Sequence, residues 1–314
     1  MNVNTKITDL SGENLNATLL VTNRALAPAV EYIKGRFDIL YIDEINENSP
    51  LINVTGLLSS GWDQIDKPLL NKLPNLKIIS HLANGLDSID LQTTQDRKIA
   101  LFNTPDAVVN DTADLAMAFI INLSRRFVIN HKFVEQGLWG KQAYALGQTL
   151  TNKRVGIVGL GKIGKTIAKR CSAFDMQIHY WGRTDQNIES YTYHQCLSDM
   201  AKNVDFLVVS CAGNAQTRSL INKQVFANLK PSAFVVNVAR GFVINQVDLI
   251  DSLQTNQIAG AGLDVFEDEP NVPNGLLNRE NVIVQPHAGS ATQETRSFMF
   301  WQVANHLVKF YNRH

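Results

Sequence analysis

The stretch Lys153-Arg-Val-Gly-Ile-Val-Gly-Leu-Gly-Lys-Ile-Gly-Lys165 decides the fold of this chain. It opens with a short apolar run typical of a buried parallel strand, made by Val155, Ile157 and Val158. The glycines that follow have the spacing G-x-G-x-x-G, at Gly159, Gly161 and Gly164, and residues 162–174 have the pattern of a helix. Strand, glycine turn and helix in this order predict a dinucleotide site.

Each glycine has a separate physical task in such a turn. Gly159 permits the tight bend, Gly161 lets the backbone approach a pyrophosphate, and Gly164 lets helix and strand pack closely. The helix N-terminus, with Lys162 and Ile163, offers N–H groups and the positive end of the dipole to the anion. The alternative is a glycine-rich turn that binds nothing, which the flanking strand and helix disfavour.

Composition sets the class of protein. The chain has 314 residues, enough for two domains, with 45% hydrophobic and 18% charged residues. Its formal net charge is zero, so bulk charge indicates neither a nucleic-acid nor a membrane partner.

Targeting and metal signals are sparse. The stretch Met1 to Leu10 is polar, and no apolar run is long enough to span a bilayer, so we expect a cytoplasmic protein. The three cysteines lack C-x-x-C spacing and the histidines form no H-x-H or H-E-x-x-H pattern. We therefore expect no disulfide framework and no catalytic metal.

The first hundred residues alternate apolar runs with helical patterns. The expected strands are 18–22, 37–42, 52–58 and 76–80, and the expected helices are 26–34 and 62–73. This alternation predicts a small, flavodoxin-like parallel α/β domain. Asn84-Gly85-Leu86-Asp87 follows a strand end, where open α/β sheets bind ligands.

The rest of the chain predicts a Rossmann-type, doubly wound domain. Residues 111–137 have an apolar-rich helical pattern of unusual length, and further strands are expected at 177–181, 205–211, 233–239, 258–264 and 281–285. A final helix is expected over 292–311, with a capping box from Ser290 and Gln293.

Three polar residues each follow an expected strand of this second domain, at Arg240, Glu269 and His287. Such strand ends face the ligand crevice, so the three side chains could converge on one substrate. A guanidinium binds a carboxylate or keto oxygen through two parallel hydrogen bonds, and a histidine can pass a proton to a developing alkoxide. A glutamate beside the histidine orients the imidazole and favours its charged form. With a nicotinamide alongside, this set describes reduction of a 2-keto acid.

Taken singly, each of these residues also has an ordinary structural interpretation. A lone arginine after a strand is most often a surface charge, and a lone histidine is more often structural than catalytic. Glu269 lies in an acidic run that could be a solvated loop.

Six segments together resemble the D-isomer-specific 2-hydroxyacid dehydrogenase family, over nearly the whole chain and in the family's order. They are residues 84–90, 103–106 with 113–117, 155–164, 237–241, 263–270 and 286–290. The resemblance is greatest to the glyoxylate, hydroxypyruvate and hydroxyphenylpyruvate reductase branch.

The resemblance implies roles for particular residues. The family's substrate-binding arginine falls on Arg240, its glutamate on Glu269 and its acid/base histidine on His287. It further implies that Asp264 holds the nicotinamide carboxamide and that the backbone of Asn84 and Gly85 holds the substrate carboxylate. The implied cofactor site also includes Ala239 and Gly289, and Cys211 follows a strand near the expected nicotinamide as a small wall residue.

The resemblance also implies a domain map and an assembly. The substrate domain would be discontinuous, 1–103 with 289–314, and the NAD(P)-binding domain would be 104–288. The family forms homodimers mainly through the cofactor domains. Trp139 lies where relatives extend an aromatic towards the neighbouring subunit, although it could equally be an ordinary packing residue.

The end of the second expected strand bears on the cofactor. NAD sites usually place an acidic residue there, but Gln177-Ile-His-Tyr-Trp181 is followed by Gly182, Arg183 and Thr184. Arg183 and Thr184 suit a 2′-phosphate, which favours NADP(H) with NAD(H) still possible. Asp185 lies just beyond and could fold back, and Arg183 could be a solvated loop residue.

Two other functions share this scaffold. A formate or phosphite dehydrogenase would need a pocket for a very small anion, whereas Leu57 and Leu58 favour a substrate side that accepts a carbon side chain. A dinucleotide-sensing, corepressor-like protein would bind the cofactor without turnover. The sequence favours an NADP(H)-preferring 2-keto acid reductase for which glyoxylate, hydroxypyruvate or a larger 2-keto acid is the substrate.

Overall fold

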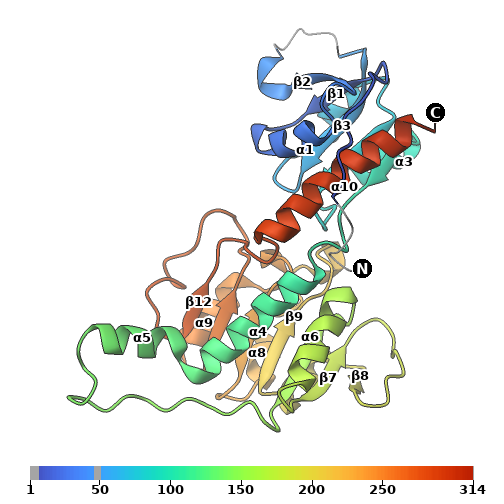
Figure 1. Cartoon of the computed structure of the whole chain (residues 1–314). Coiled ribbons are helices and arrows are strands. Elements are labelled where there is room, and N and C mark those ends of the chain that lie inside the picture. The colour runs from blue at the N-terminus through green and yellow to red at the C-terminus, as the bar shows by residue number, and fades with distance from the viewer. Residues whose placement is uncertain (1–6, 46–50, 314) are drawn as a thin grey trace. The chain divides into compact units, whose positions relative to one another are not determined.

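The computed structural model describes residues 7–45 and 51–313, so the first six residues of the polar N-terminal stretch lie outside the described residues. The chain forms two compact units (Figure 1). The first unit consists of Met1–Val108 with Ser290–His314, and the second of Val109–Gly289. Each contains one parallel sheet covered by helices, which confirms the predicted α/β class with two parallel sheets.

The first unit contains a five-stranded parallel sheet in the order β2-β1-β3-β4-β5. Its strands are β1 (Thr18–Val21), β2 (Asp38–Tyr41), β3 (Val54–Ser60), β4 (Ile78–Leu82) and β5 (Ala100–Phe102). Its helices are η1 (Arg24–Leu26), α1 (Ala27–Tyr32), η2 (Ile42–Glu44), α2 (Lys67–Asn71), α3 (Leu91–Asp96) and α10 (Gln293–Tyr311). This order is that of a flavodoxin-like sheet.

The C-terminal helix α10 belongs to the first unit because it packs on that unit's central strands. The Ser80 hydroxyl donates to the Val303 carbonyl at 2.9 Å, and Thr55 and Tyr311 share a hydroxyl hydrogen bond at 2.8 Å. A Cβ at Gly56 would lie 2.4 Å from the Leu19 side chain and 3.0 Å from the Tyr311 hydroxyl. Glycine therefore lets β3 accept this helix at short range.

The second unit contains a seven-stranded parallel sheet in the order β12-β11-β10-β9-β6-β7-β8. Its strands are β6 (Arg154–Val158), β7 (Gln177–Trp181), β8 (Thr192–His194), β9 (Phe206–Val209), β10 (Phe234–Asn237), β11 (Gly260–Leu263) and β12 (Val282–Val284). Its helices are α4 (Val109–Arg125), α5 (Phe127–Glu135), α6 (Lys162–Ser172), α7 (Leu197–Asn203), η3 (Ala215–Thr217), α8 (Lys223–Asn228), η4 (Gly241–Val243) and α9 (Gln246–Gln254). The strand order reverses between β6 and β9, which is where doubly wound sheets bind their ligands.

Apolar cores lie on both faces of this sheet. One core joins the sheet to α4 and α6 and includes Phe119 and Ile167, and the other joins it to α7, α8 and α9 and includes Phe226. A Cβ at Gly262 would lie 2.7 Å from the Phe119 ring, so this glycine lets α4 rest directly on β11. Burial on both faces explains the continuous apolar runs that marked these strands in the sequence.

Several sequence expectations were wrong in detail. The helical pattern over 111–137 forms two helices, because Arg126 adopts a left-handed conformation at φ 54° between α4 and α5. The helix expected over 62–73 is only α2, and strands β5 and β8 were not predicted. The side-chain cap of α10 is Thr292, whose hydroxyl accepts from the Thr295 N–H at 3.2 Å, so Ser290 is not the capping residue.

Candidate active site

The glycine turn after β6 is shaped by close backbone contacts. Gly159 has φ 93°, and a Cβ there would lie 2.5 Å from the Cys211 Cα. A Cβ at Gly164 would lie 2.2 Å from the Gly159 carbonyl oxygen. A side chain at either position would therefore push the turn apart.

The same turn leaves room for a ligand at the start of α6. A Cβ at Gly161, the N-cap residue, would meet no described atom within 4 Å. Among the described residues, no side chain caps this end of α6 and no acidic residue lies in its first turn. The open cradle and the positive helix end fit the pyrophosphate of a dinucleotide.

Arg183 and Thr184 lie in the loop after β7, where both side chains are exposed. The strand itself ends at Trp181, without an acidic residue at its carboxyl end. The next residue, Asp185, uses its carboxylate to accept hydrogen bonds from the Tyr180 hydroxyl and the Asn187 N–H.

Glu269 and His287 form a hydrogen-bonded pair at the carboxyl edge of the same sheet. Glu269 Oε2 lies 2.8 Å from His287 Nδ1, and Glu269 Oε1 accepts from the Phe266 N–H at 3.0 Å. Burial alone would raise the pKa of Glu269, but these hydrogen bonds and the nearby charges of His287 and Arg240 outweigh it. The net effect is a pKa below the ordinary value of 4.5, so Glu269 is a carboxylate at neutral pH and Nδ1 of His287 donates to it.

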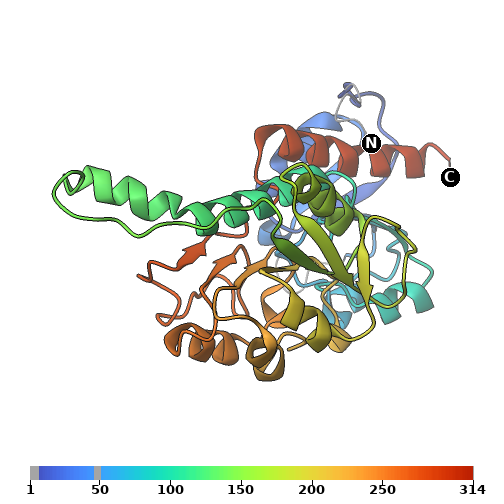
Figure 2. The same cartoon turned by 90° about the horizontal axis from the view of Figure 1, so that it is seen from below.

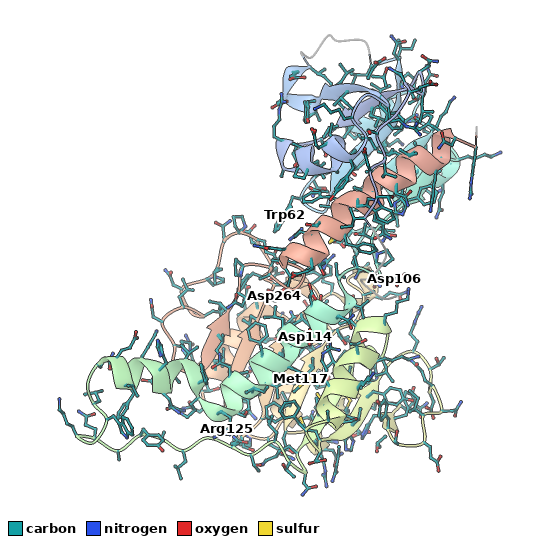
Figure 3. The ribbon with its side chains drawn as sticks, in the orientation of Figure 1. Trp62, Asp106, Asp114, Met117, Arg125 and Asp264 are labelled. Atoms are coloured by element: carbon teal, nitrogen blue, oxygen red, sulfur yellow. The ribbon has the colours of Figure 1, made fainter. Side chains whose placement is uncertain are left out.

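Asp264 holds the segment that carries His287. The Asp264 carbonyl accepts from the His287 N–H at 2.9 Å, and its carboxylate accepts from the N–H groups of Ala288 at 2.6 Å and Gly289 at 2.9 Å. Asp264 lies just after β11 (Figure 3), and its side chain is buried, at 2% exposed. Burial raises its pKa against the opposing effect of these hydrogen bonds.

This clamp fixes an unusual backbone conformation. His287 has φ 53°, in the left-handed region, which costs a non-glycine residue about 1 kcal/mol. The hydrogen bonds to Asp264 offset that cost and fix the direction of the imidazole. The family resemblance implied a role for Asp264 towards the cofactor only, and this second role was missed.

Arg240 follows β10, and a buried asparagine fixes its backbone. Asn237 Oδ1 accepts from the Ala239 N–H, and Asn237 Nδ2 donates to the Arg240 carbonyl, both at 3.0 Å. A Cβ at Gly213 would lie 2.5 Å from the Arg240 Cγ, so this glycine makes room for the arginine stem. Asn237 is a positioning residue to which the sequence pattern gave no role; its place at the end of a buried strand was the available signal.

Cys211 follows β9 and lies against the glycine turn that follows β6. Burial raises the pKa of its thiol to about 11, so the sulfur is protonated at neutral pH. Such a thiol is a poor nucleophile.

Asn84 and Gly85 follow β4 in the first unit. Asn103 Nδ2 donates to the Asn84 carbonyl at 2.8 Å, and the Thr104 N–H donates to the Ala83 carbonyl at 2.9 Å. These bonds hold the loop that carries the two residues. By contrast, Leu58 is fully buried in β3, which contradicts the expectation that its side chain lines the substrate side.

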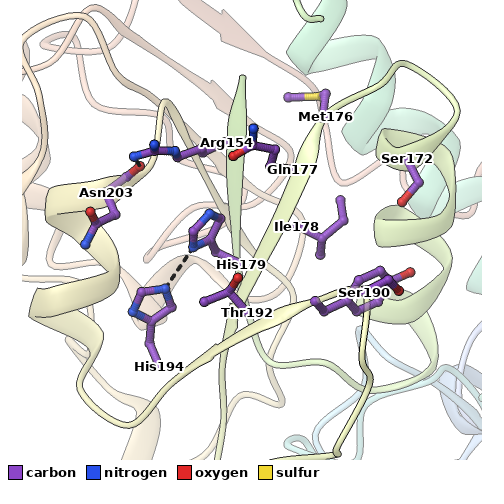
Figure 4. Close-up of a pocket in the computed structure, with 11 residues that line it drawn as sticks. Arg154, Ser172, Met176, Gln177, Ile178, His179, Ser190, Thr192, His194 and Asn203 are labelled. Atoms are coloured by element: carbon purple, nitrogen blue, oxygen red, sulfur yellow. Dashed lines mark hydrogen bonds between the residues drawn. The ribbon is translucent and has the colours of Figure 1, made fainter. Parts of the chain in front are cut away.

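A separate pocket of about 680 Å³ lies around β7 and β8 (Figure 4). His179 Nδ1 and His194 Nε2 are 2.8 Å apart there, and burial lowers the pKa of His179 to about 4. The described lining residues include none of the predicted site residues.

Within residues 7–45 and 51–313, no cluster of three His, Cys, Asp or Glu side chains could hold a metal, and no helix has the length and apolarity to cross a bilayer.

Dinucleotide-dependent dehydrogenases combine a glycine turn with a proton-transferring group at the same edge of a parallel sheet, and this is the class that the second unit defines. Residues 117–289 match the family described as D-isomer specific 2-hydroxyacid dehydrogenase, NAD binding domain. The chain belongs to that family and is an NAD(P)-dependent oxidoreductase acting on CH–OH groups. The predicted family is therefore confirmed.

Individual relatives resemble the chain over most of its length. It is 38% identical to glyoxylate/hydroxypyruvate reductase A of Arabidopsis thaliana, covering 90% of this chain and 93% of the relative. It is 39% identical to hydroxyphenylpyruvate reductase of Plectranthus scutellarioides, covering 77% of each. The crystal structure of an NADPH-dependent glyoxylate/hydroxypyruvate reductase from Sinorhizobium meliloti, in complex with NADP and malonate, superposes with a TM-score of 0.87 at 34% identity, covering 93% of this chain and 92% of that one.

The Glu269–His287 pair predicts a pH-dependent stability. A carboxylate whose folded-state pKa is depressed stabilises the fold fully above its ordinary value of 4.5 and loses that effect as pH falls through the folded-state pKa. Glu269→Gln should therefore lower the thermal midpoint at about pH 7 and have a shrinking effect towards about pH 3.5. Scanning calorimetry across this range measures the difference, with the more exposed Glu267→Gln as the matched control. An equal destabilisation at both ends of the range would contradict the pairing.

Proposed function

We propose that this protein is an NADPH-preferring D-2-hydroxyacid dehydrogenase that works as a 2-keto acid reductase. The observation that carries the proposal is the Glu269–His287 pair, held by Asp264 and adjoined by Arg240, on the sheet edge that also carries the glycine turn. This arrangement supplies a proton donor and a carboxylate-binding cation beside a dinucleotide cradle.

The cofactor would lie along the carboxyl edge of the second sheet. The proposed binding residues are Gly159, Gly161, Lys162, Ile163, Gly164, Arg183, Thr184, Cys211, Ala239, Asp264 and Gly289. The open cradle at Gly161 and the short approach between Gly159 and Cys211 support the fit. When bound, the reduced nicotinamide supplies the hydride that the substrate carbonyl carbon accepts.

Arg240 would bind the substrate carboxylate and keto oxygen, and the backbone of Asn84 and Gly85 would bind the carboxylate. Negative charge develops on the keto oxygen as its carbon is reduced, and His287 would neutralise it by donating a proton from Nε2. Glu269 holds Nδ1 and so fixes which nitrogen faces the substrate. The product is the 2-hydroxy acid.

The preference for NADPH rests on the loop after β7. Arg183 and Thr184 occupy the place where NAD sites usually carry an acid. The Sinorhizobium relative is described as NADPH-dependent and was crystallised with NADP. We include NADH as a slower second cofactor because Arg183 does not repel a free ribose hydroxyl.

The substrate class follows the names of several relatives. They are described as reductases of glyoxylate, hydroxypyruvate, hydroxyphenylpyruvate and 2-ketogluconate. All of these substrates except glyoxylate, which is an aldehyde acid, carry a keto group beside a carboxylate. We propose glyoxylate, hydroxypyruvate or a larger 2-keto acid as the substrate of this protein.

Removing the proton donor or the anion-binding cation should separate catalysis from cofactor binding. His287→Ala and Arg240→Ala should each reduce kcat/KM by about 10²- to 10⁴-fold, because each removes a group that acts on the developing charge. The NADPH dissociation constant, measured by fluorescence titration, should stay within about threefold of wild type. His194→Ala, from the pocket around β7 and β8, serves as the control and should keep its turnover. Unchanged turnover in either site variant would contradict the active-site assignment.

We also propose a homodimer formed through the second units. Large exposed apolar side chains gather on α5 and the segment after it, including Phe127 at 68%, Trp139 at 75% and Leu146 at 85% exposed. Figure 2 shows α5 and this returning segment extending away from the rest of the second unit. Apolar surface concentrated in this way is typical of an interaction site, and a second copy of the chain satisfies it.

Charges placed on this arm should dissociate the dimer. The double substitution Trp139→Glu and Leu146→Glu should convert a dimer to a monomer, because burying two carboxylates in an apolar interface is costly. Size-exclusion chromatography with light scattering gives the mass directly. Ile52→Glu, at an exposed residue of the first unit, is the matched control and should remain dimeric. A dimer that persists in the double variant would rule out this interface.

A further inference from the structure

A hydrogen-bonded network links the glycine turn to the loop after β7. The Tyr180 hydroxyl donates to Asp185 Oδ1 and accepts from the Gln186 N–H at 2.9 Å. The Gln186 side chain then donates to the Leu160 carbonyl, inside the glycine turn, at 2.8 Å. These hydrogen bonds therefore fix the position of the loop after β7 relative to the glycine turn, where we expect the pyrophosphate to bind.

This network is built on a buried aromatic base. Tyr180 is 1% exposed, and its ring centroid lies 5.3 Å from that of Tyr193. The Tyr193 hydroxyl donates to the Gly182 carbonyl at 3.3 Å. The loop is thus held at Gly182 and again at Asp185 and Gln186, and the two residues between these points are Arg183 and Thr184.

The network bears on cofactor binding because it holds a negatively charged side chain, Asp185. Hydrogen bonds from Tyr180 and the Asn187 N–H lower the pKa of Asp185, so its side chain is a carboxylate at neutral pH. Burial and the bond to Asp185 raise the pKa of Tyr180, so its hydroxyl keeps its proton and stays a donor. A carboxylate released at this loop would repel a 2′-phosphate and accept from a ribose 2′-hydroxyl, as the acidic residue of NAD sites does.

We infer that Tyr180 is a positioning residue for cofactor choice: it holds the Asp185 carboxylate against its own loop and leaves Arg183 and Thr184 to meet the 2′-phosphate of NADPH. This inference rests on the proposed preference for NADPH. It assigns the discrimination between the two cofactors to the position of the Asp185 carboxylate as well as to the charge of Arg183. A carboxylate held against its own loop repels the 2′-phosphate less than one released towards it.

The test compares two adenosine nucleotides that differ in the 2′-phosphate. Isothermal titration calorimetry of the full chain with 2′,5′-ADP and with 5′-AMP reports binding without turnover. Wild type should bind 2′,5′-ADP more tightly. Tyr180→Phe keeps the ring but loses the hydroxyl, so it should weaken 2′,5′-ADP binding about tenfold and leave 5′-AMP within about twofold. Adding Asp185→Asn should restore the lost affinity, because it removes the released charge.

Matched controls separate charge from loop structure. Tyr193→Phe removes a hydroxyl that binds the same loop without a hydrogen bond to Asp185, and it should leave the ratio of the two affinities within about twofold. Asp185→Asn alone should also keep the wild-type ratio, because Tyr180 already restrains the carboxylate. This single substitution is at an exposed residue, so it still tests the inference if Tyr180→Phe does not fold.

The contradicting outcomes are distinct. If wild type binds both nucleotides equally, the proposed NADPH preference fails. If wild type prefers 2′,5′-ADP but Tyr180→Phe keeps that preference, or loses both affinities without rescue by Asp185→Asn, the inference alone is overturned. A several-fold gain in 2′,5′-ADP affinity from Asp185→Asn in the wild-type background would also overturn it.

Discussion

The parallel pairing of the seven strands in the second unit is the constraint on which the site depends. Because β6, β9, β10, β11 and β12 run in the same direction, residues that follow them meet at one edge of the sheet. The glycine turn, Arg240, Asp264 and His287 come from different parts of the sequence and reach that edge for this reason alone. If one of these strands ran in the opposite direction, the residue that follows it would lie at the other edge of the sheet, away from the site.

Local hydrogen bonds then fix the positions of the side chains at this edge. Asp264 holds His287 in a left-handed conformation, Glu269 engages Nδ1, and Asn237 fixes the backbone before Arg240. At the other end of the proposed cofactor site, Tyr180 and Gln186 connect the loop after β7 to the glycine turn. In both places a buried side chain, Asp264 or Tyr180, fixes the backbone or loop that carries a more accessible side chain. The reactive or recognising side chain therefore needs little reorganisation on binding.

The sequence predicted what depends on pattern and missed what depends on loop geometry. The apolar run within 205–211 located β9 (Phe206–Val209) because strands buried on both faces are largely apolar. The break at Arg126 was missed because a left-handed arginine has no sequence signal, and the three-residue β8 was missed because it is short and partly exposed. Arg240, Glu269 and His287 were predicted because each follows an expected strand. The hydrogen bonds that Asp264, Asn237 and Tyr180 make could be found only in the structure. Leu58 was wrongly placed because a strand's two faces are indistinguishable when both are buried.

The most direct measurement is the initial rate of NADPH and NADH oxidation with glyoxylate, hydroxypyruvate and phenylpyruvate in turn. We predict NADPH oxidation with at least one of these acids, faster than NADH oxidation under the same conditions. Faster NADH oxidation would contradict the role given to Arg183 and its loop. If the protein binds NADPH but oxidises it with none of the three acids, the central claim of 2-keto acid reduction is contradicted.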